Sequence, residues 1–353
     1  MGALEKNIIT PSEATGLAQE AYDETSGLMI LSKALPEVST NGQTVMRWTP
    51  DQPGIERDLM KYRAWDAEVG YGKTTSQTQE RYAPLLPLGK KMRITERDII
   101  ENGAGNEFVR QRGEEYLVQL GTEAQITMEL ARLDVFVDAR IEVDSNGAKG
   151  TWDFMRPRNQ QNVAPAKKWS DPTSDPIQDV LDWVKIMKKN HGSVPSAVLT
   201  TSGVIDALTT NQTMITLYTQ KSLADSVPRI SRDQVMSVFA QYAGLTDIRM
   251  ADLLYQDLCA QNGFLFPGAL DDIFPENVFL MFQSFNDTGM GYTASGPTAE
   301  AQNPEYGINK SENTGLVGML LSDNAPVGYD VYVNGSGIPV LERANSTFKA
   351  VVL

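Results

Sequence analysis

The sequence has almost none of the residues that thiol and imidazole chemistry requires. Cys259 is the only cysteine and His191 the only histidine among the 353 residues. A disulfide needs two thiols and a structural zinc site uses up to four Cys or His ligands, so neither is expected within one chain. A Ser-His-Asp or Cys-His catalytic arrangement would have to use His191, which follows a lysine pair and precedes Gly192, a context typical of a helix end.

The motifs of nucleotide binding and of serine hydrolases are also missing. The Gly-x-Gly pairs at 103–105, 289–291 and 335–337 do not continue as Gly-x-Gly-x-x-Gly, and no Gly-x-x-x-x-Gly-Lys-Ser/Thr or Gly-x-Ser-x-Gly motif occurs. Adjacent acids such as Asp271 and Asp272 point apart on regular secondary structure, which is typical of a solvated face. The sequence therefore predicts no catalytic, cofactor-binding or metal-binding residue, and a protein that is not an enzyme.

Long apolar runs and excess positive charge are absent as well. No stretch approaches the roughly 18 consecutive apolar residues of a membrane span, and residues 1–10 show no secretory signal, so we expect a chain that stays inside the cell that makes it. The net charge of −14 argues against binding to nucleic acid or to an acidic membrane through a general basic surface. The C-terminal segment 244–353 holds four basic and 13 acidic side chains.

What is present is an ordinary globular composition, with 41% apolar and 22% charged residues. At roughly 100 to 200 residues per domain, the length predicts two or three domains. Apolar residues recur at helical spacing from Glu107 to Val135, with Gly113 and Gly121 as the weak points of the predicted helix.

Local capping and turn signals indicate further elements. Asp175 followed by Pro176, and Lys188-Lys189 at the other end, predict a helix over 176–189. Ser145-Asn146-Gly147 between strand-like runs predicts a hairpin, and short strands follow to the end of the chain. The predicted fold class is α+β.

The segment 43–93 has aromatic side chains but no dense apolar run that could form a core. Strand-like patterns at 44–49 and 81–92 flank a polar, charged middle, which predicts a long β-hairpin or extended loop. Because this segment cannot bury its aromatic residues within itself, we expect it to lie across a neighbouring subunit, with a disordered loop as the alternative. The candidate inter-subunit contact residues are Trp48, Arg57, Lys61, Tyr62, Arg63, Trp65, Tyr71 and Tyr82.

Four segments, taken in order, carry a family resemblance. They are Pro84-Leu85-Leu86-Pro87-Leu88-Gly89-Lys90 through Asp98; Lys168-Trp169-Ser170-Asp171 leading to Ser174-Asp175-Pro176; Gly192-Ser193-Val194-Pro195 through Leu208; and Gly328 through Leu353 with its Gly337-Ile338-Pro339-Val340-Leu341. Together they resemble the major capsid proteins of tailed bacteriophages, in particular the lambda-type E family with the HK97-like capsid fold.

The resemblance implies a division of the chain. Residues 1–42 would form an N-terminal arm, and 43–93 the extended loop. Residues 94–193 and 316–353 would form the peripheral domain with its long spine helix, and 194–315 the axial domain. The implied function is a structural major capsid protein that self-assembles into the icosahedral shell enclosing phage genomic DNA.

The resemblance also implies partners and a location. We expect hexamers and pentamers of this chain in the shell, a portal protein, and in some cases a decoration protein. A separate scaffolding protein is expected because only 42 residues precede the extended loop. Double-stranded DNA would be packaged without sequence-specific binding, and no membrane is involved. The chain would belong to the virion and assemble in the host cytoplasm.

Two alternatives stay open at this point. An encapsulin-like nanocompartment shell protein would share the fold and enclose cargo enzymes instead of a genome. A soluble enzyme or binding module would show turnover or ligand binding as a monomer.

Overall fold

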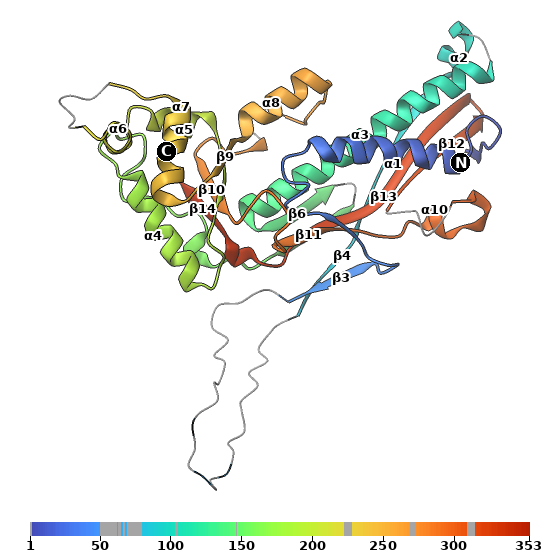
Figure 1. Ribbon diagram of the computed structural model, residues 1–353. Coiled ribbons are helices and arrows are strands. Elements are labelled where there is room, and N and C mark those ends of the chain that lie inside the picture. Colours follow the sequence, from blue (N-terminus) through green and yellow to red (C-terminus); the bar gives the residue numbers. More distant parts are fainter. Residues whose placement is uncertain are drawn as a thin grey trace.

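The computed structural model describes residues 2–49, 62, 65, 68, 80–102, 105–145, 147–221, 228–268, 273–308 and 315–353. These residues form two parts, each built around a β-sheet, and the N- and C-termini lie at opposite ends of the molecule (Figure 1). Within the described ranges, no helix is both long and apolar enough to cross a membrane.

The longest element is the spine helix α3, Asn106–Asp138, whose 33 residues span about 50 Å. The predicted helix over 107–135 is therefore confirmed. The helix ends where Ala139 adopts a left-handed conformation and its N–H donates to the Val135 carbonyl. The buried guanidinium of Arg156 donates to the carbonyl oxygens of Phe136 and Val137 at the same end. Burial lowers the pKa of Arg156 to about 9.

Helix α1, Pro11–Leu28, lies alongside the spine helix (Figure 1). Its start follows from a Thr10 side chain that accepts from the Glu13 N–H and from proline at the first turn. At Gly121 a side chain has no room, because a Cβ there would lie 2.3 Å from the Ala18 carbonyl oxygen. Gly121 lowers the intrinsic stability of α3 as an isolated helix. In the folded chain, the same residue is the point at which α1 and α3 approach each other closely.

A six-stranded sheet packs against these two helices. Its longest strand, β13 (Val327–Leu341), pairs antiparallel with β12 (Leu316–Asn324), β5 (Leu86–Ile94) and β11 (Gly291–Ser295). Strand β1 (Ala3–Leu4) pairs with β12, and β2 (Glu37–Ser39) runs parallel to β11.

The two predicted strands of segment 43–93 have different places in the fold. Strands β3 (Val45–Trp48) and β4 (Arg81–Pro84) pair with each other and form a two-stranded ribbon. Strand β5 pairs with β13 over nine residues, so the two-stranded ribbon ends at Pro84 and the main sheet begins at Leu86.

The hairpin predicted around residue 146 is confirmed. Strand β6 (Arg140–Ser145) pairs with β7 (Ala148–Asp153), and Gly147 supplies the positive φ of the turn. The hairpin follows directly after the spine helix and packs against it.

The second part has a four-stranded sheet covered by short helices. Trp169 lies near its centre, with its ring 4.8 Å from that of Phe279 and 5.7 Å from that of Trp183. Helix α4 begins as predicted, with the Asp175 side chain accepting from the Gln178 N–H. The strands are β8 (Ala197–Thr200), β9 (Asp247–Met250), β10 (Val278–Phe282) and β14 (Thr347–Val351), and the larger helices are α4 (Pro176–Lys189), α5 (Ser202–Leu208), α6 (Gln212–Thr219), α7 (Arg232–Val238) and α8 (Ala251–Asn262).

Several short elements complete the fold. They are the helices α2 (Glu96–Asn102) and α10 (Ala299–Gln302), the π-helical turn Phe239–Ala243, and the 3-10 turns Arg158–Gln160, Pro304–Tyr306 and Ala344–Ser346.

Each of the two sheets contains strands from more than one of the expected domain segments. Helix α4, expected in the peripheral domain, packs its apolar face into the core of the second part. Strand β14, also expected there, pairs with β10 over five residues. Conversely β11, from the expected axial segment, pairs with β13 in the first sheet. The chain crosses between the two parts more often than its sequence order suggests.

Replacing Gly121 by alanine tests the close approach of α1 and α3. The added Cβ forces one helix to move, so we expect the free energy of unfolding to fall by about 1–3 kcal/mol in urea denaturation, as overpacking does. Gly16→Ala on α1 is the control, because nothing lies within 4 Å of its Cβ and alanine favours a helix by about 1 kcal/mol. A Gly121→Ala protein as stable as the wild type would contradict this packing.

Candidate assembly interface

The described candidate contact residues divide into one that is buried and three that are exposed. Trp48 is only 4% exposed, and its ring lies 5.4 Å from that of Phe154. Tyr82 is 71% exposed and Trp65 96%, and Tyr62 is fully exposed. Arg57, Lys61, Arg63 and Tyr71 lie outside the described residues.

Trp48 is buried against a residue of its own chain that lies outside segment 43–93. Phe154 follows the β6–β7 hairpin, more than 100 residues later in the sequence, and no local pattern could pair the two side chains. Trp48 and Phe154 belong to the same apolar cluster and fix the base of the ribbon to the body. Tyr62, Trp65 and Tyr82 remain candidates for contact with another subunit.

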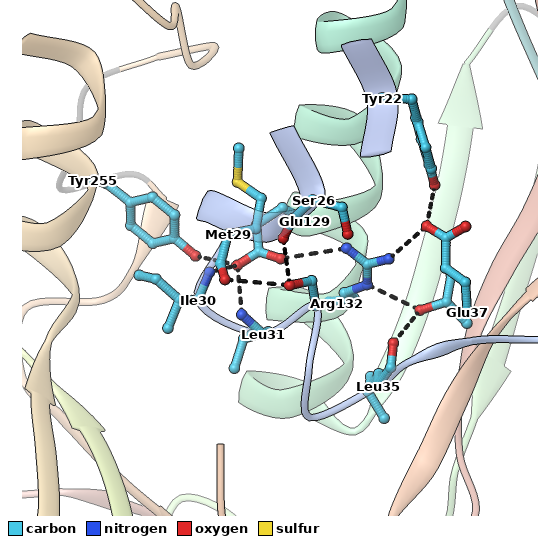
Figure 2. Close-up of polar contacts among 12 residues, drawn as sticks. Tyr22, Ser26, Met29, Ile30, Leu31, Leu35, Glu37, Glu129, Arg132 and Tyr255 are labelled. Atoms are coloured by element: carbon cyan, nitrogen blue, oxygen red, sulfur yellow. Dashed lines mark hydrogen bonds and ion pairs between the residues drawn. The ribbon is translucent and has the colours of Figure 1, made fainter. Parts of the chain in front are cut away.

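A buried polar network is centred on Glu129 of the spine helix (Figure 2). One carboxylate oxygen, Oε1, accepts from the N–H groups of Ile30 (3.0 Å) and Leu31 (2.9 Å). The same oxygen accepts from the Tyr255 hydroxyl of α8 at 3.1 Å. Burial raises the pKa of the Glu129 carboxyl, and the Arg132 charge and these three donors oppose that shift.

Arg132 extends the network toward the N-terminal segment (Figure 2). Its Nη1 lies 3.5 Å from Oε2 of Glu129, and its Nη2 donates to Oε1 of Glu37 at 3.1 Å. Its Nε donates at 2.9 Å to the Thr293 hydroxyl, which donates in turn to the Leu35 carbonyl. Tyr22 of α1 donates its hydroxyl to the same Glu37 oxygen.

The network therefore fixes residues 30–37 between the spine helix, α8 and β11. Strand β2 ends at Ser39 and β3 begins at Val45, so the anchored segment leads into the ribbon after a short turn. Holding this segment in place sets the direction in which the ribbon leaves the body. Truncating one partner of such a buried charge pair costs about 3–5 kcal/mol, because the other charge is left uncompensated.

Sequence analysis did not identify these residues. Glu129 and Arg132 lie three apart on α3 and, with Gln125, form a polar row beside the predicted apolar stripe. From sequence such a row is typical of a solvated face. One feature of the sequence indicates that this face is buried: the apolar residue Phe136 lies on the same row of the helix. In the structure Phe136 is fully buried.

Among the described residues, no three His, Cys, Asp or Glu side chains gather where they could hold a metal ion. The buried network consists of charges already engaged with one another, which is typical of a structural role.

Tyr255→Phe tests the link between α8 and the spine helix. Removing a hydrogen bond to a buried carboxylate should lower the free energy of unfolding by about 1.5–3 kcal/mol in chemical denaturation. The matched control is Tyr218→Phe, whose hydroxyl contacts Gln234 at the exposed surface, with an expected change of about 0.5 kcal/mol or less. Equal effects of the two substitutions would contradict the role given to Glu129.

Neither a family model nor a curated protein sequence matches the chain. Solved structures do match it, over nearly its whole length. A phage-related protein of Bordetella bronchiseptica has 11% sequence identity and a TM-score of 0.53, covering 99% of this chain and 97% of its own. A protein assigned as the capsid protein of an Escherichia coli prophage has 12% identity and a TM-score of 0.56, covering 98% and 99%.

The capsid of Myoviridae phage XM1 is similar as well, with 11% identity, a TM-score of 0.51, and coverage of 93% of this chain and 92% of its own. At such identities the likeness concerns the fold. The chain therefore has the HK97-like capsid fold, with both helix and sheet content, that the motifs in its sequence resembled.

Proposed function

We propose that this protein is a major capsid protein, which self-assembles into the icosahedral shell that encloses the genomic DNA of a tailed phage. The observation that carries the proposal is the end-to-end match of the fold to phage capsid structures, with 98% or more of this chain covered in two of them. A fold does not by itself determine a function, and the exposed aromatic residues of the ribbon support the same role.

The ribbon supports a function based on contacts between copies. In the described part of the chain, β3 and β4 pair only with each other, and Tyr82 on β4 is largely exposed. Tyr62 and Trp65, between the two strands, are exposed as well. Aromatic side chains typically dominate interface free energy once they are buried against a partner. The ribbon and its aromatic residues would contact the neighbouring subunit.

The finer features of such a shell belong to the same proposal. The chain would form hexamers and pentamers, assemble in the host cytoplasm around a separate scaffolding protein, and become part of the virion. A portal protein, and in some cases a decoration protein, would join it. The subunit would act through its interfaces and not as an enzyme.

Electron microscopy of the purified protein separates this function from the alternatives. Shells that enclose no enzyme, whether they are hollow or filled with nuclease-protected double-stranded DNA, support a phage capsid. Shells that enclose an enzyme would indicate a nanocompartment. A monomer with catalytic turnover or ligand binding, and no particles, would overturn the proposal.

Trp65 and Trp48 form a matched pair for testing the ribbon. Trp65 is exposed, so Trp65→Ala should leave the melting temperature of the subunit unchanged and reduce the yield of shells about tenfold or more. Trp48→Ala should instead lower the free energy of unfolding of the subunit by about 3–5 kcal/mol. Microscopy and thermal denaturation measure the two effects. Wild-type shell yield from Trp65→Ala would contradict a contact role for this residue.

The acidic composition predicts how shells interact with DNA. A net charge of −14 per subunit leaves no general basic wall, so packaged DNA would be neutralised mainly by mobile counterions. Purified shells should not retard double-stranded DNA in a gel at about 0.15 M salt. Strong retardation at that salt concentration would contradict this part of the proposal.

A further inference from the structure

A polar pocket of about 300 Å³ lies at the carboxyl end of the spine helix. Its walls are the last turn of α3, the two ends of the β6–β7 hairpin that lie nearest the helix, and the loop that follows the hairpin. Ala139 is the one apolar residue of the lining. The other lining residues include three arginines and two amides, namely Arg140, Arg156, Arg158, Gln161 and Asn162.

Arg156 brings a buried positive charge to this pocket. Its four hydrogen-bond acceptors are all neutral: the carbonyl oxygens of Phe136 and Val137, the Thr347 hydroxyl and the Gln161 side-chain carbonyl. Among the described residues, no carboxylate forms an ion pair with it. A buried charge without an opposite charge in contact is costly, so an anion that enters the pocket would be stabilised there.

Two carboxylates also line the pocket, but they do not cancel the three arginines. Asp138 lies 2.7 Å from the ammonium group of Lys349, so its charge is already matched within the chain. Asp153 is the other acid of the lining. The lining therefore keeps an excess of positive charge.

The two remaining arginines are open to a ligand. Arg158 is exposed and has no hydrogen-bond or ion-pair partner for its side chain in the part of the chain that the structure describes. Arg140 approaches Glu142 only to 3.9 Å, and both side chains are more than half exposed. Such a pair is worth about 0–1 kcal/mol, so Arg140 can turn to a ligand at small cost.

The loop that carries two of these arginines, residues 154–163, is held in place by its own chain. The buried Gln160 side chain donates to the carbonyl oxygens of Asn345 and Thr347, both at 2.8 Å. Val163 at the end of the loop forms backbone hydrogen bonds with β14 in both directions. A site whose side chains are already positioned has less conformational entropy to lose when a ligand binds.

The chain around the pocket is basic, although the protein is acidic. Residues 140–192 hold nine basic and seven acidic side chains, whereas the whole chain holds 31 and 45. Lys188 and Lys189 end α4 beside the same loop, where the Asn190 side chain donates to the side-chain carbonyl of Asn159 at 2.8 Å. An anion that approaches this region meets a favourable local potential.

We propose that this pocket binds a phosphate group, held by Arg140, Arg156 and Arg158. Planar guanidinium groups match the oxygens of phosphate in pairs, which favours phosphate over a spherical anion such as chloride. Because the side-chain carbonyl of Gln161 accepts from Arg156, the NH2 group of Gln161 is left to donate to the same ligand. The phosphate group can come from the free ion or from a DNA backbone, whose chemistry is the same at this site.

Calorimetric titration of the purified protein with inorganic phosphate, at constant ionic strength in chloride, tests the site. We expect one phosphate per chain, and binding weakened about tenfold or more by the double substitution Arg140→Gln/Arg158→Gln. The matched control is Arg97→Gln/Arg112→Gln, which removes two partly or largely exposed arginines near the other end of the spine helix and should bind within about twofold of the wild type. Absence of saturable binding, or equal binding by the two double variants, would overturn the inference.

A competition experiment distinguishes the two sources of phosphate. A short double-stranded oligonucleotide without terminal phosphates is added at low salt to the phosphate-loaded protein. Displacement of phosphate supports the site and assigns the DNA backbone to it, whereas retention supports a site for the free ion.

The site lies within one chain and is independent of the proposed function. If phosphate binds and no shells form, the proposed function fails and the site stands. If shells form and phosphate does not bind, the inference alone is wrong.

Discussion

The spine helix can be stable only if it is covered along its whole length, and most of the fold follows from how this is done. A helix of about 50 Å is longer than one compact core requires. One flank is covered by α1, which approaches closely at Gly121, and the sheet around β13 covers another. Near its carboxyl end, Leu133 and Phe136 reach an apolar cluster that also contains residues of both sheets. One helix thereby joins the two parts of the molecule, and the buried Arg156 side chain donates to two of its last carbonyl groups.

The buried charges on this helix have a different effect from its apolar side chains. An ion pair such as Glu129 with Arg132 adds little net stability, since removing both charges from water offsets most of their attraction. The ion pair instead fixes the position of neighbouring segments. A buried carboxylate needs several hydrogen-bond donors, and these are supplied only when the chain around it adopts one arrangement. Ile30, Leu31 and Tyr255 supply those donors from two segments more than 200 residues apart. We interpret the network as the device that fixes the N-terminal segment, and with it the base of the ribbon, relative to the body.

The features that could be predicted from sequence are those with local causes. The spine helix, the Asn-Gly hairpin and the capped helix α4 each depend on residues within a few positions of one another, and all three are confirmed. The features that could not be predicted depend on distant contacts. The pairing of β5 with β13 joins residues about 240 apart, and β14 enters the second sheet from the far end of the chain. Trp48 was predicted to contact another subunit because its partner Phe154 is distant in the sequence and no local pattern connects the two residues. Gly121 was predicted to be a weak point of the helix because helix propensity does not include the packing of a neighbouring helix.

A subunit built in this way leaves two kinds of unsatisfied surface, and they are unlike each other. The ribbon presents exposed aromatic side chains, Tyr82 among them, whereas a groove of about 630 Å³ lies between α3, β5, β13 and the β6–β7 hairpin, where β5 pairs with no described strand other than β13. In the proposed shell, the ribbon of one copy would contact the body of the next in a heterologous contact. Such contacts close into rings or continue without end, depending on the angle between successive subunits. Closure of the proposed shell would require a fixed angle at the base of the ribbon, and the buried network at residues 30–37 lies where it could fix that angle.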